Sequence, residues 1–148
     1  MMNTIRHILQ VKGQDAWTIS PDATVFQALR MMADKDVGFL IVLDGDELIG
    51  TISERDYARK VILFNKSSRE TLVREIMRTN FPTIHPDQTV HECMQIMMEQ
   101  RARYVPVIED DGQLLGVISI GDVVNDIIYQ QRQTIKEMEE KMRGGGAV

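Results

Sequence analysis

The chain has 148 residues, of which 43% are hydrophobic, and its formal net charge is −5. This length suits one compact domain or two halves that share a core, and the acidic balance excludes a general nucleic-acid binder, whose phosphate contacts need a basic surface. A single cysteine excludes an internal disulfide. Because the sequence shows no signal-peptide pattern and no apolar run of about 18 residues, we expect a cytoplasmic protein without a membrane span.

The chain contains an internal repeat. Thr18–Val25 returns as Thr83–Val90, and Leu48–Asp56 returns as Leu114–Asp122, with 11 of the 17 aligned residues identical. The offset is 65 residues in the first window and 66 in the second, because copy two has one more residue in the turn between them. A duplicated fold tolerates an insertion in a turn. Since the two halves are equivalent, we expect function where they meet.

Each copy begins with a short helix, because Ile5–Leu9 resembles Val73–Met77. The segment Thr-Ile-X-Pro that follows predicts a short strand. Apolar residues then recur at i, i+3, i+4 and i+7, which predicts an amphipathic helix. They are Val25, Ala28, Leu29 and Met32 in copy one, and Val90, Cys93, Met94 and Met97 in copy two. Cys93 therefore replaces a core alanine, and we interpret it as a core residue and not as a reactive thiol.

A β-hairpin follows the helix in each copy. Short apolar runs at 38–43 and 104–108 predict buried strands, and an Asp/Gly turn connects each run to a second strand, at 48–53 or 114–119. Pro106 cannot donate a ladder hydrogen bond, which predicts a strand edge or a gap in the sheet. A second helix starts at Glu54 or Ile120, so each copy is predicted as β-α-β-β-α.

The last helix extends beyond its counterpart in copy one. Its apolar stripe consists of Val124, Ile127 or Ile128, Gln131, Ile135, Met138 and Met142. Glu137 with Lys141, and Glu139 with Arg143, have the i,i+4 spacing of helical ion pairs. Residues 144–146 are glycines, which predict a helix stop. The predicted organisation is repeat one with its leader helix at 3–65, repeat two with its leader helix at 70–130, and a helix extension with a Gly-rich tail at 131–148.

The junction between the last strand and the last helix carries the same motif in both copies, Gly-X-Ile-Ser-X-X-Asp, with Ser53 and Asp56 in one and Ser119 and Asp122 in the other. Ser-x-x-acid can be a capping box, in which the serine caps the helix and the acid reaches back to its amide. Alternatively, the carboxylate accepts hydrogen bonds from ribose hydroxyls while the serine and the helix amides bind a phosphate.

These repeated motifs, together with the strand Tyr104–Val107, resemble a tandem pair of CBS domains, also called a Bateman module. The resemblance covers about residues 3–130. It implies an α+β fold in which two repeats pack with pseudo-two-fold symmetry, and a regulatory module that binds AMP, ADP, ATP, NAD(H) or S-adenosylmethionine in a cleft between them. In the family, one ligand takes its ribose contact from the Asp of one repeat, and its base and phosphate contacts from the first two strands of the other.

Carried onto this sequence, the resemblance implies two nucleotide sites. The first consists of Ser53, Arg55 and Asp56 with Thr83, Arg103, Tyr104 and Pro106. The second consists of Ser119 and Asp122 with Thr18, Gly38, Phe39 and Ile41. Arg55 and Arg103 align with Gly121 and Gly38, so both guanidinium groups would serve the first site, where they could bind a phosphate bidentately.

Other chemistry has little support in the sequence. His85, His91 and Cys93 lie close together but on different elements or helix faces, so we predict no metal site. Phosphate-loop and nucleophile motifs do not occur, and we predict no enzymatic activity. We therefore expect a nucleotide sensor that forms a homodimer and acts on a separate, unidentified client protein, with no nucleic-acid or membrane partner. The alternative is a dimeric scaffold that binds no ligand, in which the Ser-x-x-Asp motifs only cap helices.

Overall fold

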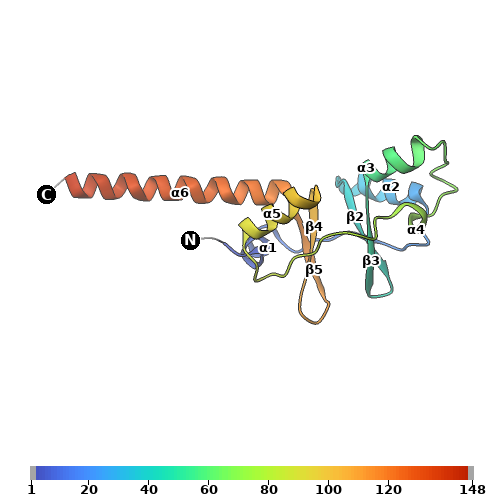
Figure 1. Cartoon of the computed structure of the whole chain (residues 1–148), viewed down its shortest axis with the longest axis horizontal. Coiled ribbons are helices and arrows are strands. Elements are labelled where there is room, and N and C mark those ends of the chain that lie inside the picture. Colours follow the sequence, from blue (N-terminus) through green and yellow to red (C-terminus); the bar gives the residue numbers. More distant parts are fainter. Residues whose placement is uncertain (1–2, 147–148) are drawn as a thin grey trace. The chain divides into compact units, whose positions relative to one another are not determined.

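The computed structural model describes residues 3–146 and has the mixed α+β fold expected from the sequence (Figure 1). The chain divides into two compact units. Unit 1 comprises Met1–Gln14 and Thr83–Val148, and unit 2 comprises Asp15–Pro82.

Unit 2 contains repeat one. Its elements are β1 (Thr18–Ile19), α2 (Val25–Lys35), β2 (Phe39–Asp44), β3 (Glu47–Ser53), α3 (Glu54–Tyr57), the π-helix η1 (Ala58–Ile62) and α4 (Val73–Ile76). The sheet has the order β1-β2-β3, with β1 parallel and β3 antiparallel to β2. Thr24 forms a capping box with Gln27 at the start of α2, which explains why the helix begins directly after Thr24.

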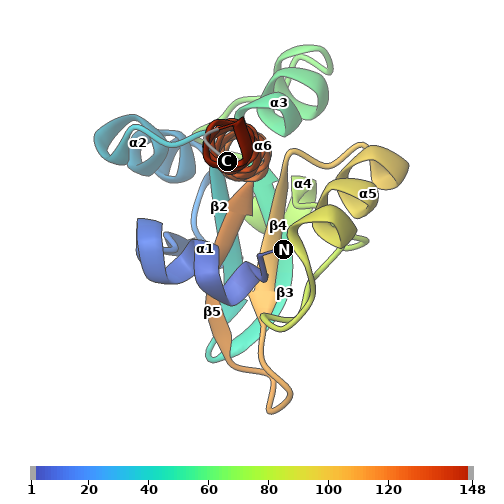
Figure 2. The same ribbon diagram turned by 90° about the vertical axis from the view of Figure 1, so that its left-hand side faces the viewer.

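Unit 1 contains repeat two. Its elements are α1 (Ile5–Lys12), α5 (Val90–Gln100), β4 (Tyr104–Ile108), β5 (Leu114–Ser119) and α6 (Ile120–Gly146). The antiparallel strands β4 and β5 form a hairpin, with α1 against β5 and α5 against β4 (Figure 2).

The first strand of repeat two is reduced to a single bridge between Ile84 and Val107. In unit 2 the amide of Ile41 donates to the carbonyl of Trp17 and extends the pairing of β1 with β2. Pro106 is the residue equivalent to Ile41, and it has no N–H to donate. The gap in the sheet that Pro106 predicted is therefore present. Because of this gap, the first strand of repeat two is shorter than predicted.

Each leader helix packs on the repeat that it does not precede. Ile5, Ile8 and Leu9 of α1 are buried in the core of repeat two, whereas Val73 and Ile76 of α4 are buried in the core of repeat one. The predicted boundaries, 3–65 and 70–130, place each leader with the repeat that follows it, because the two are adjacent in the chain. Adjacency does not decide which core has room for the apolar face of a short helix.

The same contacts hold both leaders. The Arg6 guanidinium lies 3.1 Å from the Asp87 carboxylate, and Arg74 lies 2.8 Å from Asp22. Hydrogen bonding to these carboxylates raises the pKa of both guanidinium groups. Backbone bonds are matched as well, since Ile5 N donates to Gln88 O and Val73 N donates to Ala23 O, at 2.9 and 2.8 Å. Each repeat thus holds the leader helix of the other repeat, and the two sets of contacts are chemically equivalent. We call this arrangement the exchange of the leaders.

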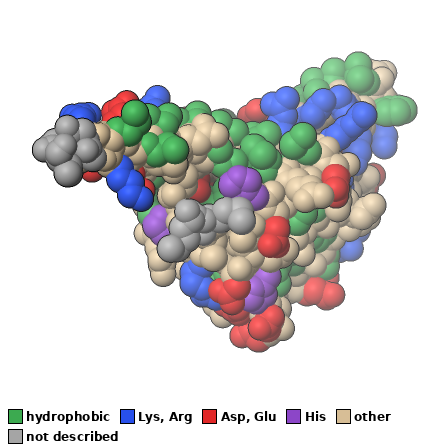
Figure 3. Space-filling view, turned by 60° about the vertical axis from the view of Figure 1, so that its left-hand side comes forward, with side chains coloured by type: hydrophobic (Ala, Val, Ile, Leu, Met, Phe, Trp, Pro, Cys, Tyr) green, Lys and Arg blue, Asp and Glu red, His purple; other side chains and the backbone are tan. Residues whose placement is uncertain are grey.

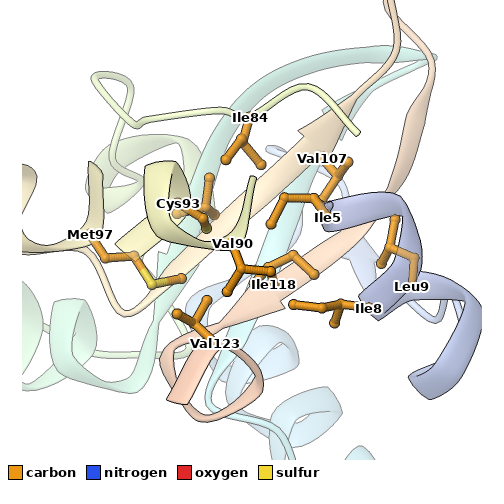
Figure 4. Close-up of a cluster of buried hydrophobic side chains, with 11 residues drawn as sticks. Ile5, Ile8, Leu9, Ile84, Val90, Cys93, Met97, Val107, Ile118 and Val123 are labelled. Atoms are coloured by element: carbon orange, nitrogen blue, oxygen red, sulfur yellow. The ribbon is translucent and has the colours of Figure 1, made fainter. Parts of the chain in front are cut away.

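Cys93 lies inside the core of unit 1, among side chains from α1, α5, β4, β5 and α6 (Figure 4). Burial raises the pKa of its thiol to about 12, with a smaller contribution from the Asp122 carboxylate. The thiolate is therefore absent at neutral pH, which agrees with the interpretation of Cys93 as a core residue.

Helix α6 continues for 27 residues, through the glycines at 144–146 that were expected to stop it. Glu139 pairs with Arg143 at 3.6 Å, but within residues 3–146 no ion pair joins Glu137 to Lys141. Apolar side chains of α6 remain on the surface (Figure 3), including Ile135 at 55% and Met142 at 77% exposure. Within the same range, no helix combines the length and the apolar character that crossing a membrane requires. Residues 147–148 of the predicted tail lie outside the described residues.

The C-terminal end of α5 is strained. Arg101 ends α5 in the left-handed conformation, with φ 52°, which costs an L-residue about 1–2 kcal/mol and glycine nothing. We expect Arg101→Gly to raise the free energy of unfolding by about 1 kcal/mol, measured by urea denaturation. Glu99→Gly, inside the same helix, is the control and should lower stability by about 1 kcal/mol. Equal effects of the two glycines would contradict the prediction.

Candidate functional site

The start of α3 in unit 2 brings together several predicted site residues, which we call the Asp56 half-site. Phe39 pairs with Ser53 across the hairpin, and the carbonyl of Gly38 accepts the amide of Glu54 at 3.1 Å. The ends of β2 and β3 are thereby tied to the helix start that carries Arg55 and Asp56. Two other predicted residues, Thr18 and Ile41, are register partners in the neighbouring pair of strands.

Unit 1 repeats this arrangement at the start of α6, which we call the Asp122 half-site. Tyr104 pairs with Ser119, and the carbonyl of Arg103 accepts the amide of Ile120 at 2.9 Å. The predicted residues Thr83 and Pro106 lie in the same unit. Thr83 is exposed just before the Ile84 bridge, whereas Pro106 is buried in β4.

Both Ser-x-x-Asp motifs form capping boxes. In unit 2 the Asp56 amide donates to Ser53 Oγ at 3.2 Å, and Asp56 Oδ2 accepts the Ser53 amide at 3.0 Å. In unit 1 the corresponding distances between Asp122 and Ser119 are 3.2 and 2.8 Å. The capping bonds predicted from the Ser-x-x-Asp pattern are therefore present in both units.

Capping leaves part of each carboxylate available. Asp56 Oδ2 accepts both the amide and the hydroxyl of Ser53, and Asp122 Oδ2 accepts the amide of Ser119. In residues 3–146, no group donates a hydrogen bond to Oδ1 of either aspartate. Their side chains are 21% and 22% exposed. Each half-site thus presents one carboxylate oxygen, held by a helix start, that can accept a hydrogen bond from a ligand.

A lysine lies beside each aspartate, and neither was predicted from the sequence. Lys12 Nζ donates to Asp122 Oδ2 at 2.7 Å. Lys60 Nζ lies 4.0 Å from Asp56 Oδ1 and donates to the carbonyl of Ile76 at 3.0 Å. The i,i+4 spacing of Asp56 and Lys60 could have revealed the second lysine. No local pattern points to Lys12, because it reaches Asp122 only through the exchange of the leader helices.

Arg55 and Arg103 are exposed, Arg55 in unit 2 and Arg103 in unit 1. Neither forms a salt bridge or a side-chain hydrogen bond with another described residue. Both guanidinium groups are therefore available to an anionic ligand, and neither is required for capping.

One group of side chains could hold a metal ion, and it differs from the set considered in the sequence. Ligand atoms of His85, Glu109 and Asp110 lie within 4.8 Å of one another. His85 Nε2 is buried, lies 3.3 and 3.0 Å from these two carboxylates, and makes no hydrogen bond within residues 3–146. However, Nδ1 accepts the amide of Asp87 at 3.1 Å, which leaves the proton of a neutral ring on Nε2. A metal would have to displace that proton.

Comparison with known proteins identifies the family. A model described as CBS domain matches residues 5–62 and 73–129, the two repeats with their leaders. The chain belongs to the CBS-domain family. The mitochondrial CBS domain-containing protein CBSX3 of Arabidopsis thaliana is 36% identical over 152 residues, which cover 96% of this chain and 73% of that protein.

Solved CBS-domain structures share the fold. A putative signal-transduction protein from Burkholderia ambifaria is 43% identical, with a TM-score of 0.83 over 87% of this chain and 96% of that chain. The CBS domain pair of protein MJ0100, solved with 5′-methylthioadenosine and S-adenosyl-L-methionine, is 21% identical, with a TM-score of 0.78 over 88% and 99% of the two chains.

The capping boxes generate the second prediction. Replacing an N-cap serine by alanine leaves a helix amide without its partner and typically costs about 1 kcal/mol. We expect Ser119→Ala to lower the free energy of unfolding by this amount, because its hydroxyl accepts the Asp122 amide. Ser68→Ala, at a half-buried position where no side-chain hydrogen bond forms among the described residues, is the control for hydroxyl removal. Urea denaturation measures both, and equal stability of the two variants would contradict the capping role.

Proposed function

We propose that this CBS-domain protein is a regulatory sensor of adenosine nucleotides. The ribose of one ligand would bind Asp56 and that of a second would bind Asp122, with base and phosphate contacts from the first two strands of the opposite repeat, as the family resemblance implies. Occupancy would change the packing of the repeats, and a separate partner protein would respond. A ligand can drive such a change only through different affinities for the two states.

One observation carries this proposal. In both units the motif aspartate is fixed by its capping box, yet Oδ1 receives no hydrogen bond from the described residues. Helix capping alone needs only the oxygen that faces the serine amide. A hydroxyl donor such as ribose would use the other oxygen, and the neighbouring amides of a helix start favour an anion.

The ligand class follows from the family together with the charges present. CBS pairs bind adenosine-containing ligands, and a relative of the same fold binds 5′-methylthioadenosine and S-adenosyl-L-methionine. In this chain Arg55, Arg103 and Lys60 would all serve the site built on Asp56. Three cations favour a phosphorylated ligand over a neutral or cationic one, so AMP, ADP, ATP or NAD(H) are the ligands proposed, with AMP as the simplest probe.

The scaffold alternative also has an observation in its favour. The apolar residues Ile128, Ile135, Met138 and Met142 are exposed along α6, and an apolar helix face of this kind suits contact with another chain. A homodimer is compatible with both functions and stays a prediction, as do the client protein and the cytoplasmic localisation. Nucleotide binding separates the two functions, because a scaffold needs none.

The third prediction tests the ribose contact. Asp56→Asn keeps an oxygen for the Ser53 amide but removes the charge, and we expect it to weaken AMP binding by about 1.5–3 kcal/mol, the contribution of a hydrogen bond to a charged group. Isothermal titration calorimetry measures the loss. Thr24→Ala removes the cap of α2 in the same unit and controls for lost stability, so it should leave affinity unchanged. If both variants bind AMP as the wild type does, Asp56 only caps its helix.

The fourth prediction concerns the arginines. We expect the wild type to prefer AMP over adenosine, and the double variant Arg55→Gln/Arg103→Gln to lose about 10-fold or more of that preference, because both guanidinium groups would pair with the phosphate. Added salt should weaken AMP binding more than adenosine binding. The matched control, Arg30→Gln/Arg132→Gln, removes one exposed arginine from each unit and should keep the preference. Titrations in an Asp122→Asn background report on the site built on Asp56 alone, and a double variant that still discriminates there would show that backbone amides hold the phosphate.

A further inference from the structure

Lys12 is held at the Asp122 half-site by two short hydrogen bonds. Its ammonium donates to Asp122 Oδ2 at 2.7 Å and to the carbonyl of Val117 at 2.6 Å. The side chains of Lys12 and Asp122 are only 32% and 22% exposed. An ammonium group on a flexible stem normally remains in water, so this half-buried pair fixes a lysine that could otherwise move freely.

A ribose at Asp122 would compete with this lysine. Asp122 Oδ2 already accepts the Ser119 amide at 2.8 Å in addition to Lys12, and Oδ1 is the oxygen that receives no hydrogen bond from residues 3–146. In a bidentate arrangement, two vicinal hydroxyls donate one hydrogen bond to each oxygen of a carboxylate. Because Oδ2 already accepts two hydrogen bonds, one for each lone pair, the hydroxyl that donates to it in this arrangement takes the position of the Lys12 ammonium.

Displacing Lys12 has a cost that depends on the ligand. Removing the partner of a partly buried charge is unfavourable unless a new partner replaces it. A neutral nucleoside offers none, whereas a phosphate on the same ligand offers an anion within reach of a four-carbon side chain. The ligand that displaces the ammonium from the carboxylate would then bind it again through its phosphate.

We propose that Lys12 is a specificity-determining residue of the Asp122 half-site, which makes the site select phosphorylated adenosine ligands. This inference rests on the proposed function and adds a cation to the site that contains neither Arg55 nor Arg103. The two half-sites differ in this respect. Lys60 lies 4.0 Å from Asp56 and keeps its hydrogen bond to the Ile76 carbonyl, so a ribose at Asp56 does not have to displace it.

Calorimetry with AMP and adenosine in an Asp56→Asn background tests the inference, because binding then reports on the Asp122 half-site. We expect that background to prefer AMP by about 10-fold or more, the scale of one hydrogen bond to a charged group. Lys12→Met should weaken AMP binding and leave adenosine binding equal or tighter, which reduces the preference to about two-fold or less. Lys12→Arg keeps the charge and should retain the preference, and Lys136→Met, which removes an exposed charge from α6, should change neither ligand.

The outcomes separate this inference from the function on which it rests. If Lys12→Met weakens both ligands by the same factor, or if AMP remains preferred, the lysine only stabilises the half-site and the inference is overturned. A melting temperature for each variant shows whether a common loss reflects unfolding. If neither ligand binds the wild type, or if Asp122→Asn leaves binding in the Asp56→Asn background unchanged, the proposed function fails as well.

Discussion

The reciprocal burial of the two leader helices is the interaction on which the rest of the structure depends. Each unit completes its core only with apolar side chains from the leader of the other repeat, and fully burying one such Ile, Leu or Val contributes about 1.5–3 kcal/mol. The matched pairs Arg6–Asp87 and Arg74–Asp22 fix the direction in which each leader enters. Exposed ion pairs of this kind add little stability, so burial supplies the energy and the ion pairs supply the register. Lys12 lies at the Asp122 half-site because α1 packs on repeat two.

The motif aspartates serve folding through one carboxylate oxygen and leave the other for the binding proposed above. Their capping boxes hold the carboxylates at the helix starts before any ligand arrives, so binding does not have to order them. In this sense the capping alternative and the ribose alternative describe two oxygens of the same group.

Local patterns predicted most of the fold. The i, i+3, i+4 spacing from Val25 and Val90 placed α2 and α5, and the position of Pro106 anticipated the gap in the sheet of unit 1. The glycines at 144–146 were misleading, because a long helix can continue through weak helix formers at its frayed end. The exchange of the leaders, and with it Lys12, could not be predicted, since no pairwise pattern in one sequence reports which of two similar cores a short helix will enter. Residues of the candidate sites were inferred from the family resemblance that the repeated motifs carry, and the capping bonds of Ser53 and Ser119 from the Ser-x-x-Asp pattern, whereas the lysines beside the aspartates became apparent only in the structure.

The exchange of the leaders also determines the order in which the two cores can form during synthesis. The core of unit 2 uses residues between Ile19 and Ile76, so all of its parts are present once α4 has left the ribosome. The core of unit 1 joins Ile5 to Val123, and such distant contacts form slowly because a long loop must close first. Helix α1 is made first, yet its apolar face has no core to enter until almost the whole second repeat exists. Until Val123 has been made, the nascent chain therefore carries Ile5, Ile8 and Leu9 without the core that buries them, and exposed apolar surface at this stage invites aggregation or chaperone binding.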